Sequence, residues 1–446
     1  MRMQLTRRAT LRSTLLGLSL TATLGRVSFA LADAPGDKRF IVVLQRGALD
    51  GMSAVVPYGD ANLVQLRPAL IPPAIGQPGG MFDLGGFYGL SPNYPNMAAM
   101  YQSGELLPIH AVAGPYRTRS HFEAQDLLQL GTADETGITS GWLNRVLAEL
   151  PQPTTGPLGL NVGLGTPLLL QGATHINSYA PEHFGEPSPD LMARIEALNA
   201  HDLLLSQAIA EGLQEARFDK SVIRTAAPAT PIPATPIPAT AAGDADMSSS
   251  MSPGGAMAGG AIMSDDRARA PGDLPKVPGG FQQLATQTGQ LLAAPGGPRI
   301  AVFQLEGWDT HGNQVAGLKK PMSGLDAGIQ SLKLALGPAW AQTCVLIITE
   351  FGRTARMNGT KGTDHGTAAA AFALGGAVKG GRVAVTWPGL SAGQLFQNRD
   401  LAPTRDIRSV AKGALAQHLG LSHAALARVF PNSGDAVPLG GIIRPA

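Results

Sequence analysis

Short runs of consecutive apolar residues recur along the chain and alternate with segments of helical periodicity. Runs of this kind are typical of strands in a parallel sheet, because helices cover both faces of such a sheet. We predict strands at Phe40–Gln45, Leu106–Ala113, Pro167–Gln171, Arg299–Leu305, Cys344–Thr349 and Ala370–Leu374. We predict helices at Ser120–Leu130, Gly141–Leu150, Pro189–Leu213, Phe281–Leu292, Pro321–Leu336 and Ile407–Leu419. This alternation predicts a three-layer, doubly wound α/β fold with a mostly parallel sheet.

One segment follows neither pattern. Residues 225–280 contain Ala-Thr-Pro-Ile-Pro twice and are then rich in Ser, Gly and Met. Large apolar side chains are too few there to offset the entropy lost on ordering. We therefore predict a flexible low-complexity insertion within a single α/β domain that spans residues 33–446.

The N-terminus has the pattern of an export signal. Arg7 and Arg8 precede an apolar run at Leu15–Leu24, and Ala30-Leu31-Ala32 has the form of a cleavage site. The paired arginines are similar to those of twin-arginine signals, which are addresses rather than anchors. The run has about ten residues, whereas a spanning helix needs about 20, so we expect no stable membrane span. We predict that residues 1–32 are a signal peptide and that the protein is periplasmic or secreted.

Composition excludes several classes of protein. Charged residues make up 15% of the chain and the net charge is +2, which excludes a basic protein that binds nucleic acid. Residues 1–32 carry five arginines and no acid, so the rest of the chain has a net charge of −3. Aromatic residues, at 5%, are too few for a surface that stacks on single strands. A single cysteine, Cys344, excludes a disulfide-stapled scaffold.

Candidate metal ligands gather at the ends of the predicted strands. In open α/β sheets, ligands bind beyond the carboxyl ends of the strands, and polar residues stand at four such ends. Imidazole and carboxylate groups both bind divalent cations such as zinc. The candidate metal ligands are Asp50, Asp309, His311, Glu350 and His365.

Each candidate ligand also has a structural role open to it. These roles are a turn or helix cap for Asp50, local loop hydrogen bonds for Asp309 and His311, an ion pair with Arg353 for Glu350, and a hydrogen-bonded pair with Asp364 for His365. The set is more informative than its members, because all of them fall at predicted strand ends.

A hydroxyl nucleophile is available where a predicted helix begins. Ser120 starts that helix, and a helix N-terminus favours a transferring anion. The hydroxyl needs a base or a metal to become nucleophilic. The alternative is a capping box formed by Ser120 with Glu123. Arginines bind phosphate or sulfate oxygens through paired hydrogen bonds. The candidates are Arg117, Arg119 and Arg353, for which a structural surface role is equally open.

Several motifs together carry a family resemblance. They are Arg46-Gly47-x-x-Asp50-Gly51, Ser120-His121-Phe122-Glu123, Gly307-Trp308-Asp309-Thr310-His311, Thr349-Glu350-Phe351-Gly352-Arg353-Thr354 and Thr363-Asp364-His365-Gly366. With the twin-arginine start, they resemble the exported bacterial family catalogued as domain of unknown function 1501. The resemblance extends over the chain after residue 32 apart from the insertion. The family has no established activity.

The chain also resembles, more distantly, the alkaline phosphatase and sulfatase superfamily. Members of that superfamily have an α/β fold, bind one or two divalent metals and transfer phosphoryl or sulfuryl groups. Asp50 is similar to the first metal-binding Asp of the superfamily, Asp309 to a later one and His365 to the last metal-binding His. The resemblance implies an alkaline-phosphatase-like fold and a divalent metal, which is Zn, Mg, Mn or Ca. It also implies Ser120 or Thr118 as the nucleophile.

The chain departs from the superfamily pattern at two positions. Asn313 stands where the superfamily has a His four residues after the Asp, and Phe351 stands in place of the His of an adjacent Asp-His pair. One metal site would keep Asp309, His365 and His311, and the other would keep only Asp50 and Glu350. Two functions are therefore open. The protein is a metal-dependent hydrolase of a small phosphate or sulfate ester, or it is a non-catalytic protein that binds a ligand or an envelope partner.

Overall fold

A computed structural model describes residues 37–134, 137–152, 158–163, 165–179 and 280–445. The predicted signal peptide at residues 1–32 and the predicted helix Pro189–Leu213 lie outside the described residues, as does the predicted insertion up to residue 279. No helix among the described residues is long and apolar enough to cross a membrane.

Most of the described strands join one sheet with the order β11-β5-β10-β9-β1-β8-β6-β7. Its strands are β1 (Arg39–Gln45), β5 (Leu106–Ala113), β6 (Gly159–Val162), β7 (Ile176–Tyr179), β8 (Ile300–Leu305), β9 (Thr343–Thr349), β10 (Ala369–Leu374) and β11 (Arg405–Asp406). Neighbouring strands are parallel, except that β10 is antiparallel to both β5 and β9. The sheet is mostly parallel, as predicted.

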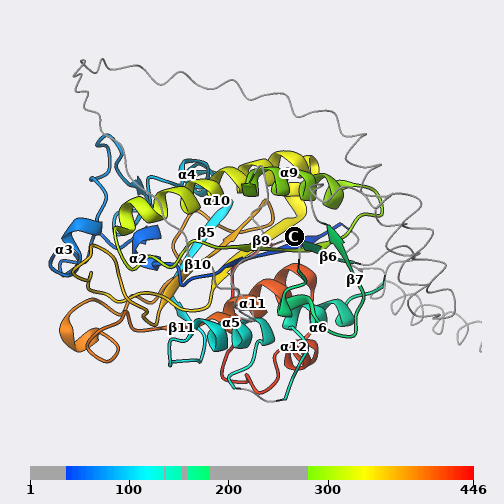
Figure 1. The fold of residues 1–446 in the computed structure, drawn as a ribbon. Helices are drawn as coiled ribbons and strands as arrows, with labels where there is room; N and C mark the ends of the chain where they lie inside the picture. Colours follow the sequence, from blue (N-terminus) through cyan, green and yellow to red (C-terminus); the bar gives the residue numbers. More distant parts are fainter. Residues whose placement is uncertain (1–36, 135–136, 153–157, 164, 180–279, 446) are drawn as a thin grey trace, which may run out of the picture.

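Helices cover both faces of this sheet, which makes the fold three layers thick (Figure 1). One face is covered by α4 (Pro95–Gln102), α9 (Gly280–Ala293) and α10 (Gln314–Leu336). The other face is covered by α5 (His121–Leu130), α6 (Trp142–Glu149), α11 (Ile407–Ala414), its π-helical continuation Leu415–Leu419, and α12 (His423–Val429). The predicted three-layer α/β architecture is confirmed, and it is compatible with the alkaline-phosphatase-like fold that the resemblance implies.

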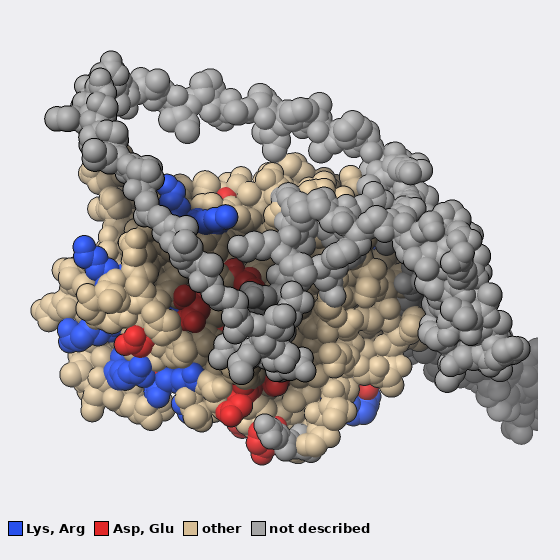
Figure 2. Space-filling view, in the orientation of Figure 1, with Lys and Arg blue, Asp and Glu red and all other residues tan. Residues whose placement is uncertain are grey.

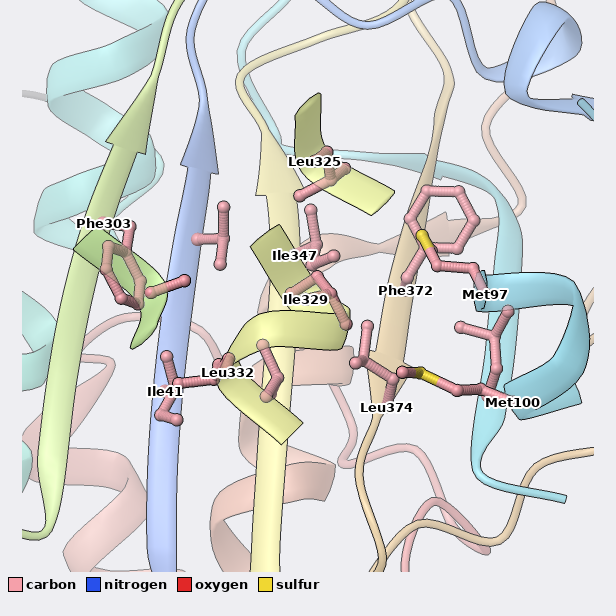
Figure 3. Close-up of a cluster of buried hydrophobic side chains, with 14 of the residues drawn as sticks. Ile41, Met97, Met100, Phe303, Leu325, Ile329, Leu332, Ile347, Phe372 and Leu374 are labelled. Atoms are coloured by element: carbon pink, nitrogen blue, oxygen red, sulfur yellow. The ribbon is translucent and has the colours of Figure 1, made fainter. Parts of the chain in front are cut away.

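The central strand β1 shows why the apolar runs become strands. All of its residues are buried, with Ile41 in the core cluster on the α9–α10 side and Val42 in the cluster on the opposite side. Figure 3 shows Ile41 in one layer of the core with Ile329 of α10, Met97 of α4 and Phe372 of β10. Full burial of such a side chain stabilises the fold by about 1.5–3 kcal/mol, so a strand with two covered faces needs an uninterrupted apolar run.

The predicted strand Pro167–Gln171 is wrong. These residues form a short 3-10 helix, Leu168–Leu170, in which the N–H of Gln171 donates to the carbonyl of Leu168. The run is apolar because Leu169 and Leu170 are buried in the core on the α6 side. The sheet continues instead through β6 and β7, two short strands that the apolar pattern did not indicate.

The helix predicted at Pro321–Leu336 begins earlier than expected. In the structure α10 starts at Gln314, and Pro321 lies inside it. A second sheet of three short strands, β2 (Val55–Val56), β4 (Gly89–Leu90) and β3 (Phe82–Asp83), was not predicted. The short helices α2 (Gly51–Ala54) and α3 (Leu63–Leu66) lie in the same stretch of chain.

One edge of the main sheet gathers the loops that carry the candidate residues. The carboxyl ends of β1, β8 and β9 lie at this edge because the three strands are parallel. Since β10 runs the opposite way, the residues before its first position reach the same edge. Asp364 and His365 therefore precede a strand rather than follow one, which corrects the sequence interpretation while keeping them at the expected edge.

Candidate metal centre

Three side chains from separate segments converge at this edge of the sheet. They are His121 in the first turn of α5, Asp309 in the loop after β8, and His365 in the loop before β10. The Nε2 atoms of His121 and His365 are 2.9 Å apart. The Asp309 carboxylate lies 3.4 Å from His365 Nε2 and 3.6 Å from His121 Nε2. Each of the three offers one donor atom to a common point.

His311 adds a fourth donor at the solvent side of the cluster. Its Nε2 atom lies 3.0 Å from Asp309 Oδ1 and 3.0 Å from His365 Nε2. Its side chain is 49% exposed, whereas that of His121 is 21% exposed. His311 therefore borders Asp309 and His365 at the solvent side, outside the group of three whose ligand atoms lie within 4.8 Å of one another.

The second ring nitrogen of each histidine faces an oxygen atom. His121 Nδ1 lies 2.7 Å from Glu350 Oε1, and His365 Nδ1 lies 3.2 Å from the carbonyl oxygen of Arg119. His311 Nδ1 lies 3.5 Å from Asp364 Oδ1. An Nδ1–H that faces an oxygen leaves Nε2 as the lone-pair donor, and this is how histidines are oriented in metal sites.

The donor atoms lie close enough together to hold one cation. Zinc–ligand bonds of about 2.05 Å place tetrahedral donors about 3.3 Å from one another. His121 Nε2 and His365 Nε2 are 2.9 Å apart, while Asp309 Oδ1 lies 3.4 Å from His365 Nε2 and Asp309 Oδ2 lies 3.6 Å from His121 Nε2. With one ligand atom from each residue, all three atoms lie within 4.8 Å of one another. Imidazole nitrogen with one carboxylate is a donor set that suits zinc, whereas Mg²⁺ and Ca²⁺ prefer oxygen ligands alone. The residues present therefore fit one divalent cation, with zinc the best match to the donors.

Glu350 supports His121 and does not offer a free oxygen. It is buried, and its Oε1 atom accepts from the N–H groups of Gly47 at 2.8 Å and Ala48 at 3.1 Å, as well as from Gln125 at 3.0 Å. Gly47 has a φ of +116°, and a Cβ there would lie 2.7 Å from the backbone nitrogen of Asp309. This position therefore favours glycine, and the loop can bring its N–H groups onto the carboxylate.

Arg353 is buried and fully engaged by protein atoms. Its guanidinium donates to the carbonyls of Gly47 at 2.7 Å and Ala48 at 2.8 Å, and it pairs with the Asp309 carboxylate. Arg353 therefore forms its ion pair with Asp309, and not with Glu350 as the sequence suggested. Arg353 ties together the loops after β1, β8 and β9, and so fixes the direction of the Asp309 carboxylate.

The carboxylates of the centre are ionised. Burial lowers the pKa of His121, but hydrogen bonds with Asp309 and Glu350 outweigh burial and raise that pKa to about 9. Burial raises the pKa of Glu350, yet its hydrogen bonds, first among them the one with His121, bring it below the ordinary value. Burial likewise opposes ionisation of Asp309, while His121, His365 and Arg353 hold its pKa far below the usual range.

Asp50 lies apart from the converging group and has a structural role. Its carboxylate caps α2 by accepting from Met52 N at 3.2 Å, and it pairs with Arg67 Nη1 at 2.7 and 3.0 Å. It also accepts from Gln314 and from Ser53, the latter at 2.9 Å. Both Asp50 and Arg67 are buried. The helix-cap alternative describes this residue, and the structure does not bring it to the other candidate ligands.

Ser120 stands at the N-terminus of α5, directly before His121. It is the N-cap residue, but its side chain makes no capping hydrogen bond, so the alternative of a capping box does not hold. Glu123 instead accepts from the Tyr116 hydroxyl. The Ser120 hydroxyl has no partner among the described residues, and Thr118, the alternative nucleophile, is exposed.

The two other arginines predicted to bind an anion are also engaged. Arg119 donates to the buried Asp400 carboxylate at 2.8 and 3.0 Å. Arg117 donates to the carbonyl of Tyr116 at 2.8 Å and to that of Gly114. Sequence reasoning named these arginines and missed His121. The sequence feature that could have indicated His121 is its position directly after Ser120, in the first turn of a helix that starts at the sheet edge.

Part of the chain matches a known protein family. Residues 266–430 match the model of a family described as "Protein of unknown function (DUF1501)". The expected family resemblance is confirmed over this range, which holds Asp309, Glu350, Arg353 and His365 but not His121. The matched range is narrower than the sequence analysis predicted.

Other comparisons give little more. No curated protein matches the chain. Among solved structures, the chain is similar to a 2-O GAG sulfatase at 11% identity and a TM-score of 0.27, over 77% of this chain. The chain covers 65% of the length of that sulfatase.

Proposed function

We propose that this protein is an exported, metal-dependent hydrolase of phosphate or sulfate esters. The observation that carries the proposal is the convergence of His121 Nε2, His365 Nε2 and the Asp309 carboxylate, with the Nδ1 atoms of both histidines held by protein oxygens. The export part rests on the N-terminal sequence. A periplasmic or secreted location reached through the twin-arginine pathway agrees with the paired arginines at residues 7 and 8.

The proposed metal ligands are His121, Asp309 and His365, with His311 at the solvent side. A divalent cation bound there supplies Lewis acidity toward a phosphoryl or sulfuryl oxygen. Glu350 holds the His121 ring by accepting from Nδ1, and Arg353 holds the Asp309 carboxylate. One cation is proposed rather than two, because the lone pairs of Asp50 and Glu350 are already used by protein donors.

Ser120 is the proposed nucleophile. Its hydroxyl is unpartnered among the described residues, and it belongs to the same turn as His121. The N-terminus of α5 favours the negative charge of a transferring group at this position. The Ser120 oxygen forms a bond to the phosphorus or sulfur, the bond from that atom to the ester oxygen breaks, and the departing alcohol takes up the serine proton. Water then hydrolyses the serine ester, which restores the hydroxyl and releases phosphate or sulfate.

A non-catalytic ligand-binding protein is the second candidate function. The observation that favours it is the engagement of all three predicted arginines, Arg117, Arg119 and Arg353, by protein oxygens. None of them is free to neutralise a transferring phosphoryl or sulfuryl group. The ligand or envelope partner would then bind at the same centre without being cleaved.

Metal analysis of the purified protein tests the metal-dependent proposal. Elemental mass spectrometry should find a stoichiometric amount of divalent metal, predominantly zinc, in the wild-type protein. His121→Ala should lose most of it, and His423→Ala, which changes an exposed histidine of α12, should keep it. Less than roughly 0.2 metal ion per chain in the gently purified wild-type protein would overturn the proposal, since a built site retains its metal.

A further inference from the structure

A pocket of about 560 Å³ lies beside the metal centre. Residues of α3, of the segment 354–364 and of the segment 390–399 line it. Its volume is within the range of about 300–1,000 Å³ that is usual for small-molecule sites. Figure 2 shows Lys and Arg side chains gathered at the end of the molecule where α3 lies. None of the metal ligands proposed above lines this pocket, so it is a separate feature.

The pocket and the metal centre share a wall. Asp364 lines the pocket and faces Nδ1 of His311, whose Nε2 atom faces Asp309 and His365. One imidazole ring therefore extends from the pocket wall to the centre. Arg399, also in the lining, donates to the carbonyl of His365 at 2.8 Å. These two contacts place the pocket next to the centre.

The lining offers hydrogen-bond donors and positive charge. The Arg356 guanidinium is exposed and makes no hydrogen bond or ion pair among the described residues, and Arg399 is 41% exposed. Asp364 is the single acid among the lining residues, so the pocket has a net positive charge. The side-chain amides of Gln65 and Asn398 also have no protein partner within the described part of the chain.

Apolar side chains complete the lining of the pocket. They belong to Leu66, Met357, Leu390 and Leu395, so the lining combines apolar side chains with amides and hydroxyls. A surface of this kind suits a ligand whose rings present C–H faces and hydroxyl edges. The free arginine adds a preference for a carboxylate or a similar anion, which guanidinium groups bind through two hydrogen bonds.

We propose that the pocket binds an anionic sugar, a sugar acid that carries the ester cleaved at the metal centre. The inference rests on the proposed function for the reacting end of the molecule, and on Arg356, Gln65 and Asn398 for the other end. Arg356 pairs with the acid group, and the amides bind sugar hydroxyls. A bare phosphate or sulfate would leave most of the 560 Å³ unfilled.

Binding of two matched sugars tests this proposal without any reaction. Isothermal titration calorimetry is run on the full chain with methyl β-D-glucuronide and with methyl β-D-glucoside, which differ in one carboxylate. The glucuronide should bind roughly tenfold tighter, as expected for a charge-assisted pair of hydrogen bonds. Arg356→Gln should abolish the difference, and Arg356→Lys should keep part of it. Arg382→Gln, which changes an exposed arginine outside the lining, should leave it unchanged.

Two results would overturn the proposal. Equal binding of the two sugars, or a preference that survives Arg356→Gln, would show that this arginine recognises no acid group. Displacement of the glucuronide by inorganic sulfate of equal affinity would show a site for a bare anion rather than for a sugar. Because neither sugar carries a phosphate or sulfate ester, failure here leaves the metal-dependent proposal untouched. An absence of bound metal, in turn, would leave the preference for the glucuronide in place.

Discussion

Each imidazole of the metal centre uses both of its ring nitrogens. For His121, one nitrogen faces Glu350 and the other faces His365 and Asp309. Glu350 is separated from His121 by 229 residues in the sequence, so only the folded sheet edge reveals that the two belong together. Glu350, predicted as a ligand, is therefore better described as the residue that orients one.

The orienting role of Glu350 gives the first prediction. Glu350→Gln removes the charge that holds the Nδ1–H of His121, while keeping the size of the side chain. Zinc affinity, measured by competition with a chromogenic chelator, should fall about 10- to 100-fold, as expected for a lost partner of a metal-binding histidine. Glu123→Gln, in the same first turn of α5 as His121, is the control and should retain full affinity. An affinity unchanged in Glu350→Gln would contradict the orienting role.

Ser120 gives the second prediction. Ser120→Ala should lower the rate of hydrolysis of aryl phosphate and aryl sulfate esters by at least about 100-fold, because the attacking hydroxyl is gone. The metal content should stay the same, because Ser120 is not a proposed ligand. Steady-state rates and elemental analysis on the same samples provide the check. Unchanged turnover would remove Ser120 as the nucleophile, and Thr118→Ala would then be the variant to measure.

At the scale of elements, the centre is assembled by loops from several strands around one buried arginine. Arg353 contacts the loops after β1 and β8 from its own position after β9. A second buried arginine, Arg67, joins Asp50 to the carbonyls of Thr354 and Ala355, at 2.6 and 2.9 Å. These arginines connect segments that the sequence places hundreds of residues apart, and they support the site without facing a ligand.

The role of Asp50 gives the third prediction. Asp50→Asn should leave the metal content unchanged, because Asp50 is outside the converging group. It should lower the free energy of unfolding by about 3–5 kcal/mol, since it leaves the buried Arg67 charge without a counter-ion. Elemental analysis and urea unfolding measure the two effects. Loss of metal with little loss of stability would instead make Asp50 a ligand.

The packing of His418 at the opposite end of β1 gives a prediction about pH. Burial, more than the nearby Lys38, lowers the pKa of His418 to about 4, although its hydrogen bond to the carbonyl of Arg39 opposes this. The unfolded chain binds a proton near pH 6.5 and the folded chain does not until about pH 4. Stability from this residue is therefore complete above about pH 6.5 and falls by about 1.4 kcal/mol per pH unit on acidification toward pH 4.

His418→Gln is the variant that isolates this effect. Its amide can still donate to the carbonyl of Arg39, and it does not titrate. Urea unfolding at pH 7.5 and at pH 4.5 should show a smaller loss of stability in the variant than in the wild-type protein. The difference should be about 2 kcal/mol. The same loss in both proteins would mean that His418 is already protonated, or is exposed, in the folded state.

At the scale of the whole molecule, the sequence predicts the strands of six or more residues in the main sheet and misses the shorter ones. Strands β1, β5, β8, β9 and β10 are predicted because both of their faces are covered, which demands apolar residues throughout. Strands β6 and β7 have four residues each, and Asn161 and Ser178 interrupt their apolar pattern, although β6 is buried throughout. The 3-10 helix Leu168–Leu170 is apolar because it is buried, and buried strands are apolar for the same reason. An apolar run alone therefore does not distinguish a short helix from a strand.

The site divides in a similar way. Asp309 is predicted from its place after a strand, because parallel topology brings such strand ends to one edge. His365 is predicted at the same edge, but it lies there because it precedes the antiparallel strand β10. The roles of Asp50, Glu350 and Arg353 depend on partners brought close by the fold, and no local pattern reports them. The role of His121 depends in the same way on Glu350 and His365, which lie 229 and 244 residues away in the sequence.

The central claim is that His121, Asp309 and His365 bind one divalent cation. The most direct test is anomalous X-ray diffraction from crystals of the full chain, with data collected on both sides of the zinc absorption edge. We predict a single strong anomalous peak between the Nε2 atoms of the two histidines and the Asp309 carboxylate, absent from crystals of His121→Ala. An anomalous peak only at another position, or no peak at this position in crystals grown with added zinc, would contradict the account.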